Sequence, residues 1–130
     1  VEWLDSTAAA QGHARTQWPL HHATVQAIVP THACATLWHH GQPLGHGLAV
    51  CERGWVGLFD LVVAPAARGQ GLGTALVRTL LHWGRAAGAQ AAYLQVREAN
   101  PRAMRLYARL GFAPCYAYHY RVPPAVAAAA

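Results

Sequence analysis

The chain has no lysine, and several other residue types and patterns are scarce or missing among its 130 residues. Without lysine it cannot form the G-K-[ST] sequence of a phosphate-loop NTPase, whose lysine reaches the β- and γ-phosphates. Its three cysteines, Cys34, Cys51 and Cys115, are an odd number without CxxC spacing, so we expect no disulfide framework and a reducing cytoplasm. No apolar run is long enough to cross a bilayer, and no basic segment with a cleavage site opens the chain. Together these absences predict a soluble cytoplasmic protein that makes no membrane contact.

Acidic residues are also few: the chain has five of them and ten arginines. The resulting net charge of +5 favours an anionic partner. The arginines are scattered and do not form a stripe with interleaved aromatic residues, so we expect no nucleic-acid partner. Nine histidines include the adjacent pairs His21-His22 and His39-His40, whose side chains should diverge. Because neither HExxH nor a zinc-type Cys/His spacing occurs, we expect no metal site.

The most informative segment is VVAPAARGQGLGTALV, residues 62–77. Leu58–Val63 is an apolar, partly β-branched strand that ends at Pro65, and a helical pattern resumes with Leu72, Leu76, Leu80 and Trp83 on one face. In the turn between them, glycines leave the backbone N–H groups open to an anion at the start of a helix. The helix dipole and the Arg68 guanidinium add positive potential. The segment therefore predicts a pyrophosphate site.

The spacing of these glycines excludes a dinucleotide-binding fingerprint. G-x-G-x-x-G starting at Gly69 would need glycine at Thr74, and starting at Gly71 it would need glycine at Leu76. The pattern that remains is R-x-x-G-x-G at Arg68–Gly73, preceded by a V-x-P step at Val63–Pro65.

Downstream, the helix ending at Gly88 leads to a second expected strand, Ala91–Val96.

A second block, NPRAMRLYARLGF, follows that strand. Asn100 and Pro101 are typical of the N-cap and first residue of a helix, and Gly111 closes that helix. One face carries Ala103, Met104, Tyr107 and Leu110.

The turn and this block, in this order, resemble the two signatures of the GNAT N-acetyltransferase superfamily over about residues 44–121. The resemblance implies an α/β (α+β) fold: a mixed, mostly antiparallel central sheet flanked by helices, with a splayed strand at the acetyl-CoA site. It also implies an acetyl-CoA-dependent enzyme that acetylates a primary amine, on a small molecule or a peptide, by direct attack. A noncatalytic GNAT-like module that binds acyl-CoA and regulates or scaffolds a neighbouring domain stays open as the alternative.

The resemblance also assigns roles to individual residues. Leu61 N–H faces the thioester oxygen, Val63 pairs with the pantetheine arm, Asn100 contacts that arm, and Tyr107 protonates the leaving sulfur. Backbone N–H groups hold the pyrophosphate, with Arg68 as a charged supplement, and come from Gly69, Gln70, Gly71, Leu72, Gly73 and Thr74. Plain structural roles also account for two of these residues, a helix N-cap for Asn100 and a packed core tyrosine for Tyr107.

The general base is less clear from the sequence. Strand alternation places Asp60 opposite Phe59 and Leu61, on the side of Leu58 and Val62. An acid within an apolar strand needs a partner, so Asp60 is either a substrate-side base, acting through water, or half of an ion pair. Glu52 and His46 are alternative bases.

We expect one domain over residues 1–124, with a weakly helical segment at 1–30, a core at 31–122 and a low-complexity tail at 125–130. Helices are expected at Glu2–Ala10 and Trp18–Val29, and strands at Thr31–His39 and Leu44–Glu52. The five tryptophans are expected in the core, although Trp55 could line an acceptor pocket. A further aromatic stretch carries Tyr116, Tyr118 and Tyr120 on one face, packed or facing substrate.

A GNAT domain normally opens with a strand before its two helices and ends in two strands. This sequence shows no opening strand, and after Phe112 it has only one short aromatic stretch. These departures suggest the C-terminal half of a tandem acetyltransferase, with a preceding domain, or a homodimer whose partner supplies the edge of the sheet.

Overall fold

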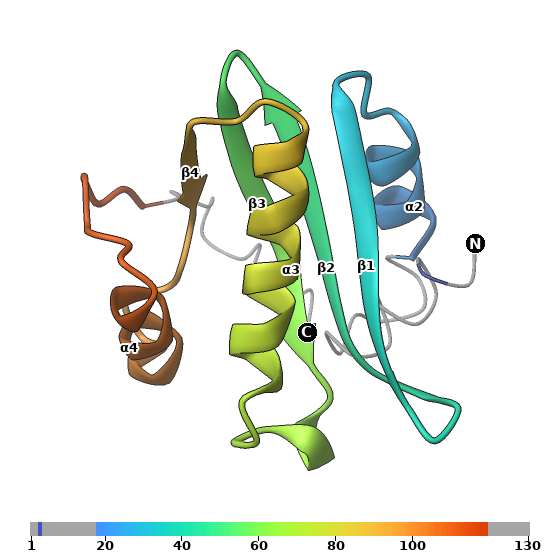
Figure 1. Ribbon diagram of the computed structural model, residues 1–130. Helices are drawn as coiled ribbons and strands as arrows, with labels where there is room; N and C mark the ends of the chain where they lie inside the picture. Colours follow the sequence, from blue (N-terminus) through green and yellow to red (C-terminus); the bar gives the residue numbers. More distant parts are fainter. Residues whose placement is uncertain (1–2, 4–17, 120–130) are drawn as a thin grey trace, which may run out of the picture.

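The structure is a computed structural model that describes Trp3 and residues 18–119. Its elements in chain order are α2 (Trp18–Gln26), β1 (Thr31–His39), β2 (Gln42–Glu52), β3 (Trp55–Val63), η2 (Pro65–Ala67), α3 (Leu72–Ala86), β4 (Ala91–Leu94) and α4 (Pro101–Arg109). The four strands form a sheet in the order β1-β2-β3-β4 (Figure 1). β1 with β2 and β2 with β3 pair antiparallel, and β3 with β4 pairs parallel. The expected mixed, mostly antiparallel sheet is confirmed.

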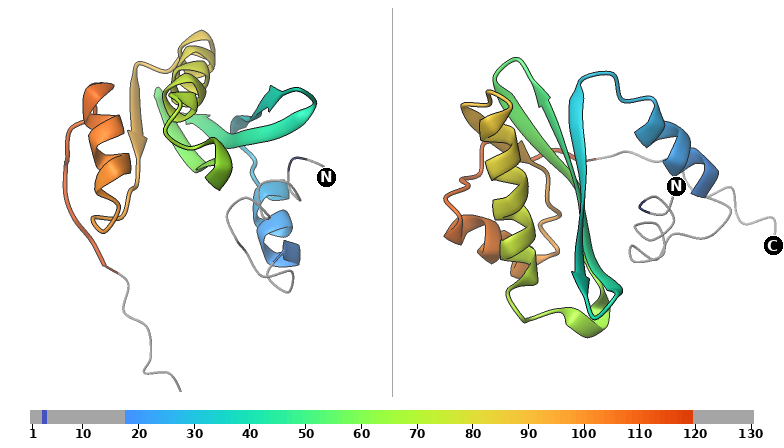
Figure 2. Two further views of the ribbon diagram at one scale, coloured as in Figure 1. Left: turned by 90° about the horizontal axis from the view of Figure 1, so that it is seen from below. Right: turned by 45° about the vertical axis from the view of Figure 1, so that its right-hand side comes forward.

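The core lies between this sheet and α3. It is built from Ala49, Val56, Leu58, Leu76, Val77 and Leu80, so the predicted helical face does carry the packing. α3 lies close to the sheet because Gly84 has no side chain there: a Cβ atom would come within 2.8 Å of Val56. α2 covers the opposite face of the sheet (Figure 2), where its Val25 is buried. Among the described helices, none is long and apolar enough to cross a membrane.

α4 begins and ends as its sequence predicts. The Asn100 side chain accepts a hydrogen bond from Ala103 N at 3.2 Å, and Gly111 follows the helix with φ +94°. The helix is anchored beside the first turn of α3, where a Cβ atom on Gly73 would lie 3.1 Å from Leu106. Tyr107 and Phe112 also pack against the core cluster. The two sequence signatures are therefore adjacent in space.

Several expected boundaries were wrong. α2 ends at Gln26 instead of Val29, which is fully exposed, and β4 ends at Leu94 instead of Val96 because its pairing with β3 stops there. Of the expected helix Glu2–Ala10 only Trp3 is among the described residues, and it is helical.

The aromatic stretch after Phe112 is described only in part. Residues 113–119 form no strand, because no described strand lies alongside to pair with them, and Tyr116 and Tyr118 are exposed. Tyr120 lies outside the described residues.

Two expectations about aromatic side chains failed as well. Trp38 is exposed instead of buried in the core, and Trp55 is also exposed, which excludes the core and leaves its alternative place at an acceptor pocket as a prediction. His39 and His40 do not diverge, because His40 turns into the left-handed region at φ +49° and brings the ring centroids to 4.0 Å.

Candidate active site

The ladder between β3 and β4 stops halfway along β3. Trp55–Leu58 pairs with Ala91–Leu94, whereas Phe59–Val63 continues along β2 alone. β3 thus separates from its parallel neighbour, as expected for the splayed strand. Backbone groups of Phe59–Val63 that point away from β2 find no ladder partner among the described strands, so they are suited to pair with an extended ligand.

The glycine turn follows this segment directly and ends at an uncapped helix. Gly69 (φ +80°) and Gly71 (φ +78°) adopt left-handed conformations that favour glycine. Gly71 is the N-cap residue, no side chain caps the helix, and the first helical hydrogen bond runs from Ala75 N to Gly71 O. The N–H groups of the first turn, on Leu72, Gly73 and Thr74, therefore remain available to an anion. Gln70 is exposed beside them.

Arg68 connects the turn to the end of β3. Its Nε donates a hydrogen bond to the carbonyl oxygen of Val63 at 3.0 Å, while the residue is exposed. The guanidinium is therefore held at the junction of strand and turn, with donors remaining for a phosphate.

Tyr107 lies on the α3 side of the sheet. It packs against the core, and its ring meets that of Phe112 edge to face at 6.0 Å between centroids. Burial raises the pKa of Tyr107 above 10.0. The hydroxyl is hydrogen-bonded to no other described residue, so it is a neutral donor that the fold itself does not occupy.

The Asn100 side chain uses its Oδ1 atom as the cap of α4. Its amide nitrogen takes no part in that bond and can still donate to a ligand. The structural role is thus present, and contact with the cofactor arm stays a prediction.

Asp60 does not follow strand alternation, and its expected side was wrong. The β2–β3 register shifts so that one residue, Gly47, opposes both Asp60 and Leu61, and Asp60 has φ +52°. This bulge reverses the alternation, so Leu61 joins Leu58 in packing against the core on the α3 side. The Asp60 carboxylate instead meets α2, where its Oδ2 lies 3.0 Å from His21 Nε2.

The two alternative bases lie in different surroundings. Glu52 is exposed at the β2–β3 turn, opposite Trp55, and this end of β3 is the far one from the glycine turn at residues 69–73. His46 is 1% exposed, and its Nδ1 lies 3.4 Å from Thr36 Oγ1. Burial lowers the pKa of His46 below 6.5, which favours neutral imidazole. Within residues 3 and 18–119, no group of three or more His, Cys, Asp or Glu side chains could hold a metal.

Sequence reasoning missed His21. Its position on a helix with a weak amphipathic pattern gives no signal that it meets β3, since the contact joins residues 39 positions apart. A shallow pocket lined in part by Val56, Leu81 and Arg85 lies at the opposite end of α3 and includes no predicted site residue.

Curated proteins of known name are similar to part of this chain. The uncharacterized N-acetyltransferase YobR of Bacillus subtilis (strain 168) is 42% identical over 69 residues, which are 53% of this chain and 28% of the relative. A mycothiol acetyltransferase of Parafrankia sp. (strain EAN1pec) is 42% identical over 87 residues, 67% of this chain and 24% of the relative. The chain thus spans less than a third of the length of these curated relatives.

The fold recurs among solved structures. An aminoglycoside acetyltransferase from an uncultured soil metagenomic sample superimposes with a TM-score of 0.73 at 24% identity, covering 95% of this chain and 89% of that one. The sequence model of the acetyltransferase (GNAT) family matches residues 2–112. The chain therefore belongs to the GNAT acetyltransferase family.

Proposed function

We propose that the chain is an N-acetyltransferase that moves the acetyl group of acetyl-CoA to a primary amine by direct attack. One observation carries the proposal: β3 leaves β4 at the residue after Leu58, and the same segment runs through the glycine turn into the uncapped start of α3. The open edge of the strand can pair with an extended polar arm, and the uncapped N-terminus of the helix that follows can bind an anion. Acetyl-CoA has both parts and supplies the activated thioester.

The residues of the turn would bind the pyrophosphate. First-turn N–H groups from Leu72 to Thr74, with those of the preceding Gly69–Gly71, point their partial positive charge at it, and Arg68 adds a full charge. Leu61 and Val63 on the open edge of β3, with Asn100 at α4, would hold the pantetheine arm and place the thioester beside β3.

Two side chains would move protons. Asp60 takes a proton from the attacking amine, directly or through water, and Tyr107 gives one to the departing thiolate. The two lie on opposite sides of the sheet, Asp60 towards α2 and Tyr107 towards α3. The acceptor amine and the departing thiolate would therefore exchange protons with side chains on opposite sides of the sheet. This fits direct attack without a covalent enzyme intermediate.

The acceptor would be a small molecule or a peptide with a primary amine. Trp55, Tyr93 and Phe59 support this, because their rings meet edge to face across β3 and β4, with Trp55–Tyr93 centroids 6.2 Å apart and Phe59–Tyr93 centroids 6.0 Å apart. Trp55 and Tyr93 are partly open to solvent. Such aromatic surfaces attract cationic groups.

Release of CoA measured with a panel of amines tests the proposal. We expect thiol release that depends on the amine, with the acetylated amine identified by mass spectrometry. Binding of acetyl-CoA by calorimetry without turnover on any amine would instead favour the noncatalytic acyl-CoA-binding module, whereas absence of both would contradict either function.

A further inference from the structure

The His21–Asp60 pair joins a helix to the bulge next to the open edge of β3. Asp60 has a left-handed backbone at φ +52°, which is unusual for a residue other than glycine and occurs more often for aspartate than for most others. Such conformations persist where surrounding contacts hold them and gather at functional sites. Here one holding contact is the 3.0 Å hydrogen bond from α2.

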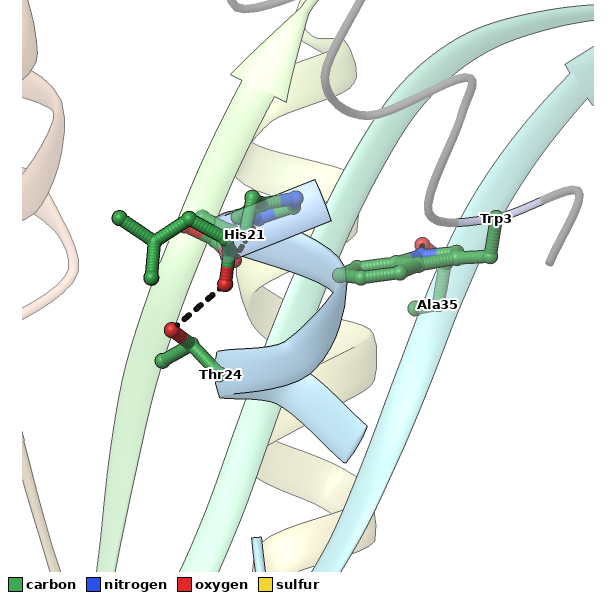
Figure 3. Close-up of polar contacts among 6 residues, drawn as sticks. Trp3, His21, Thr24 and Ala35 are labelled. Atoms are coloured by element: carbon green, nitrogen blue, oxygen red, sulfur yellow. Dashed lines mark hydrogen bonds and ion pairs between the residues drawn. The ribbon is translucent and has the colours of Figure 1, made fainter. Parts of the chain in front are cut away.

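The pair is partly shielded from water. The His21 side chain is 12% exposed and that of Asp60 is 25% exposed. A hydrogen bond to a carboxylate under these conditions is short and fixes the orientation of both groups. α2 lies against the sheet on the side away from α3, with His21 between helix and strands (Figure 3). The carboxylate thus has a defined place and is still accessible to solvent, with its side chain 25% exposed.

Asp60 also immediately precedes Leu61, the residue whose N–H we assign to the thioester. The Asp60 carboxylate is therefore one residue along the chain from the backbone N–H assigned to the thioester. The bulge places the Asp60 carboxylate on the α2 side of the sheet. Without the extra residue, Asp60 would share the core side with Leu58.

Other titratable groups surround the pair. On α2, the His22 ring centroid is 6.2 Å from that of His21, and on β2 the buried His46 lies on a strand paired with β3. On β1, partial burial and then the negative charge of Asp60 raise the pKa of Cys34. The negative charge of Asp60 is therefore felt at Cys34 on β1 as well as on its own strand.

We infer that His21 is a positioning residue for acetyl transfer: its Nε2–H holds the Asp60 carboxylate in the orientation that receives the proton of the acceptor amine. This rests on the proposed function. The amine nitrogen forms the C–N bond as the C–S bond breaks, its surplus proton passes to Asp60, and the thiolate takes a proton from Tyr107; solvent then restores both side chains.

Two substitutions at position 21 separate the loss of the hydrogen-bond donor from the loss of the imidazole ring. In His21→Ala the donor is lost, and we expect kcat/KM for the amine to fall about 10-fold or more, as for residues that orient a catalytic group, with the KM for acetyl-CoA unchanged. In His21→Gln an amide N–H replaces Nε2–H as the donor to Asp60. This variant should therefore keep most of the wild-type kcat/KM for the amine.

His22→Gln is the matched control, since it removes the neighbouring histidine of the same helix, and its kcat/KM for the amine should match the wild type. If His21→Ala has the wild-type kcat/KM for the amine, the inference is overturned. If His21→Ala does not fold, the NMR measurement described next decides the question.

A second readout does not depend on activity. Nitrogen-15 NMR of the unliganded protein should show His21 as the tautomer protonated at Nε2, and Asp60→Gly, which tolerates the left-handed backbone, should abolish that preference. An unchanged tautomer in Asp60→Gly would contradict the inference. If no amine is acetylated by the wild type, the proposed function fails, while this spectrum still decides whether Asp60 fixes the imidazole.

Discussion

At the scale of single residues, environment decides which of the polar side chains can do chemistry. Tyr107 and His46 are both shielded from water, and in both the neutral form is favoured: burial raises the pKa of the tyrosine and lowers that of the histidine. Asp60 is instead partly open and paired to His21. A neutral hydroxyl donor on one side of the sheet and a carboxylate on the other are the two groups that the proposed acyl transfer would use.

Replacing Tyr107 with phenylalanine should leave the fold and CoA affinity intact and lower kcat about 10²-fold, the usual contribution of a positioned general acid. Because burial raises the pKa of Tyr107 above 10.0, its contribution in the wild type should persist up to that pH. Steady-state kinetics and CoA titration of the same preparation measure both. Unchanged turnover on the true acceptor would return Tyr107 to a packing role.

His46 should make the folded state sensitive to acid. Its pKa is lowered from 6.5 by burial, so below pH 6.5 the unfolded chain binds a proton that the folded chain does not. The free energy of unfolding should therefore fall as pH drops through that value, by at most about 1.4 kcal/mol per pH unit for one group. Thermal melts should show a weaker acid decline in His46→Gln than in the wild type. His82→Gln, at an exposed position of α3, should keep the wild-type decline; equal declines in both variants would exclude His46.

At the scale of elements, sequence patterns predicted what local rules determine. Pro65, the glycines and the apolar repeat of α3 define the strand–turn–helix unit, and Asn100 and Gly111 define α4, because caps and turns depend on neighbours in sequence. Alternation failed at Asp60, since a bulge depends on how β2 is paired opposite. The ends of β4 and α2 were misplaced for the same reason: tertiary contacts decide where each stops.

The turn gives a prediction at this scale. Gly71→Val should abolish detectable CoA binding, since valine is strained at φ +78° and its side chain would stand at the anion site. Gly88→Val, at φ +102° beyond the other end of α3, brings comparable strain without obstructing the site, and should bind like the wild type. Calorimetric titration of both proteins measures this. Wild-type affinity in folded Gly71→Val would refute the assignment.

Arg68→Ala should weaken CoA binding less, by about 1.5–3 kcal/mol for one charge-assisted hydrogen bond. The same variant would lose the hydrogen bond from Arg68 to Val63, which holds the turn to β3. Arg68→Lys keeps the positive charge without the guanidinium Nε–H, so comparison of the two variants separates the effect of the charge from that of the hydrogen bond. Equal affinity in wild type and Arg68→Ala would show that backbone groups alone bind the phosphates.

At the scale of the whole molecule, the sheet has two outer strands in its described part, β1 and β4. The sequence predicted the sheet and its helices because two spaced signatures identify the fold. It could not predict what lies beyond those edges, since covering an edge depends on segments or partners with no local signature. Natural proteins pair or cover such edges because unpaired backbone groups template association.

We therefore expect the chain to associate. In light scattering, a 130-residue chain of 14.0 kDa should behave as a homodimer, or stay monomeric only when a preceding domain of a longer polypeptide is attached. Native mass spectrometry gives the length of the natural protein. A stable monomer of the chain alone, without further residues in the natural protein, would contradict this expectation.

The central claim is that the open edge of β3 and the start of α3 together hold acetyl-CoA. Backbone amide mapping by NMR during titration with CoA tests it most directly in a chain of this size. The account predicts the largest shifts at Leu61, Leu72, Gly73 and Thr74, with little change at Leu81 and Arg85 around the shallow pocket at the other end of α3. Shifts centred on that pocket, or none at saturating CoA, would contradict it.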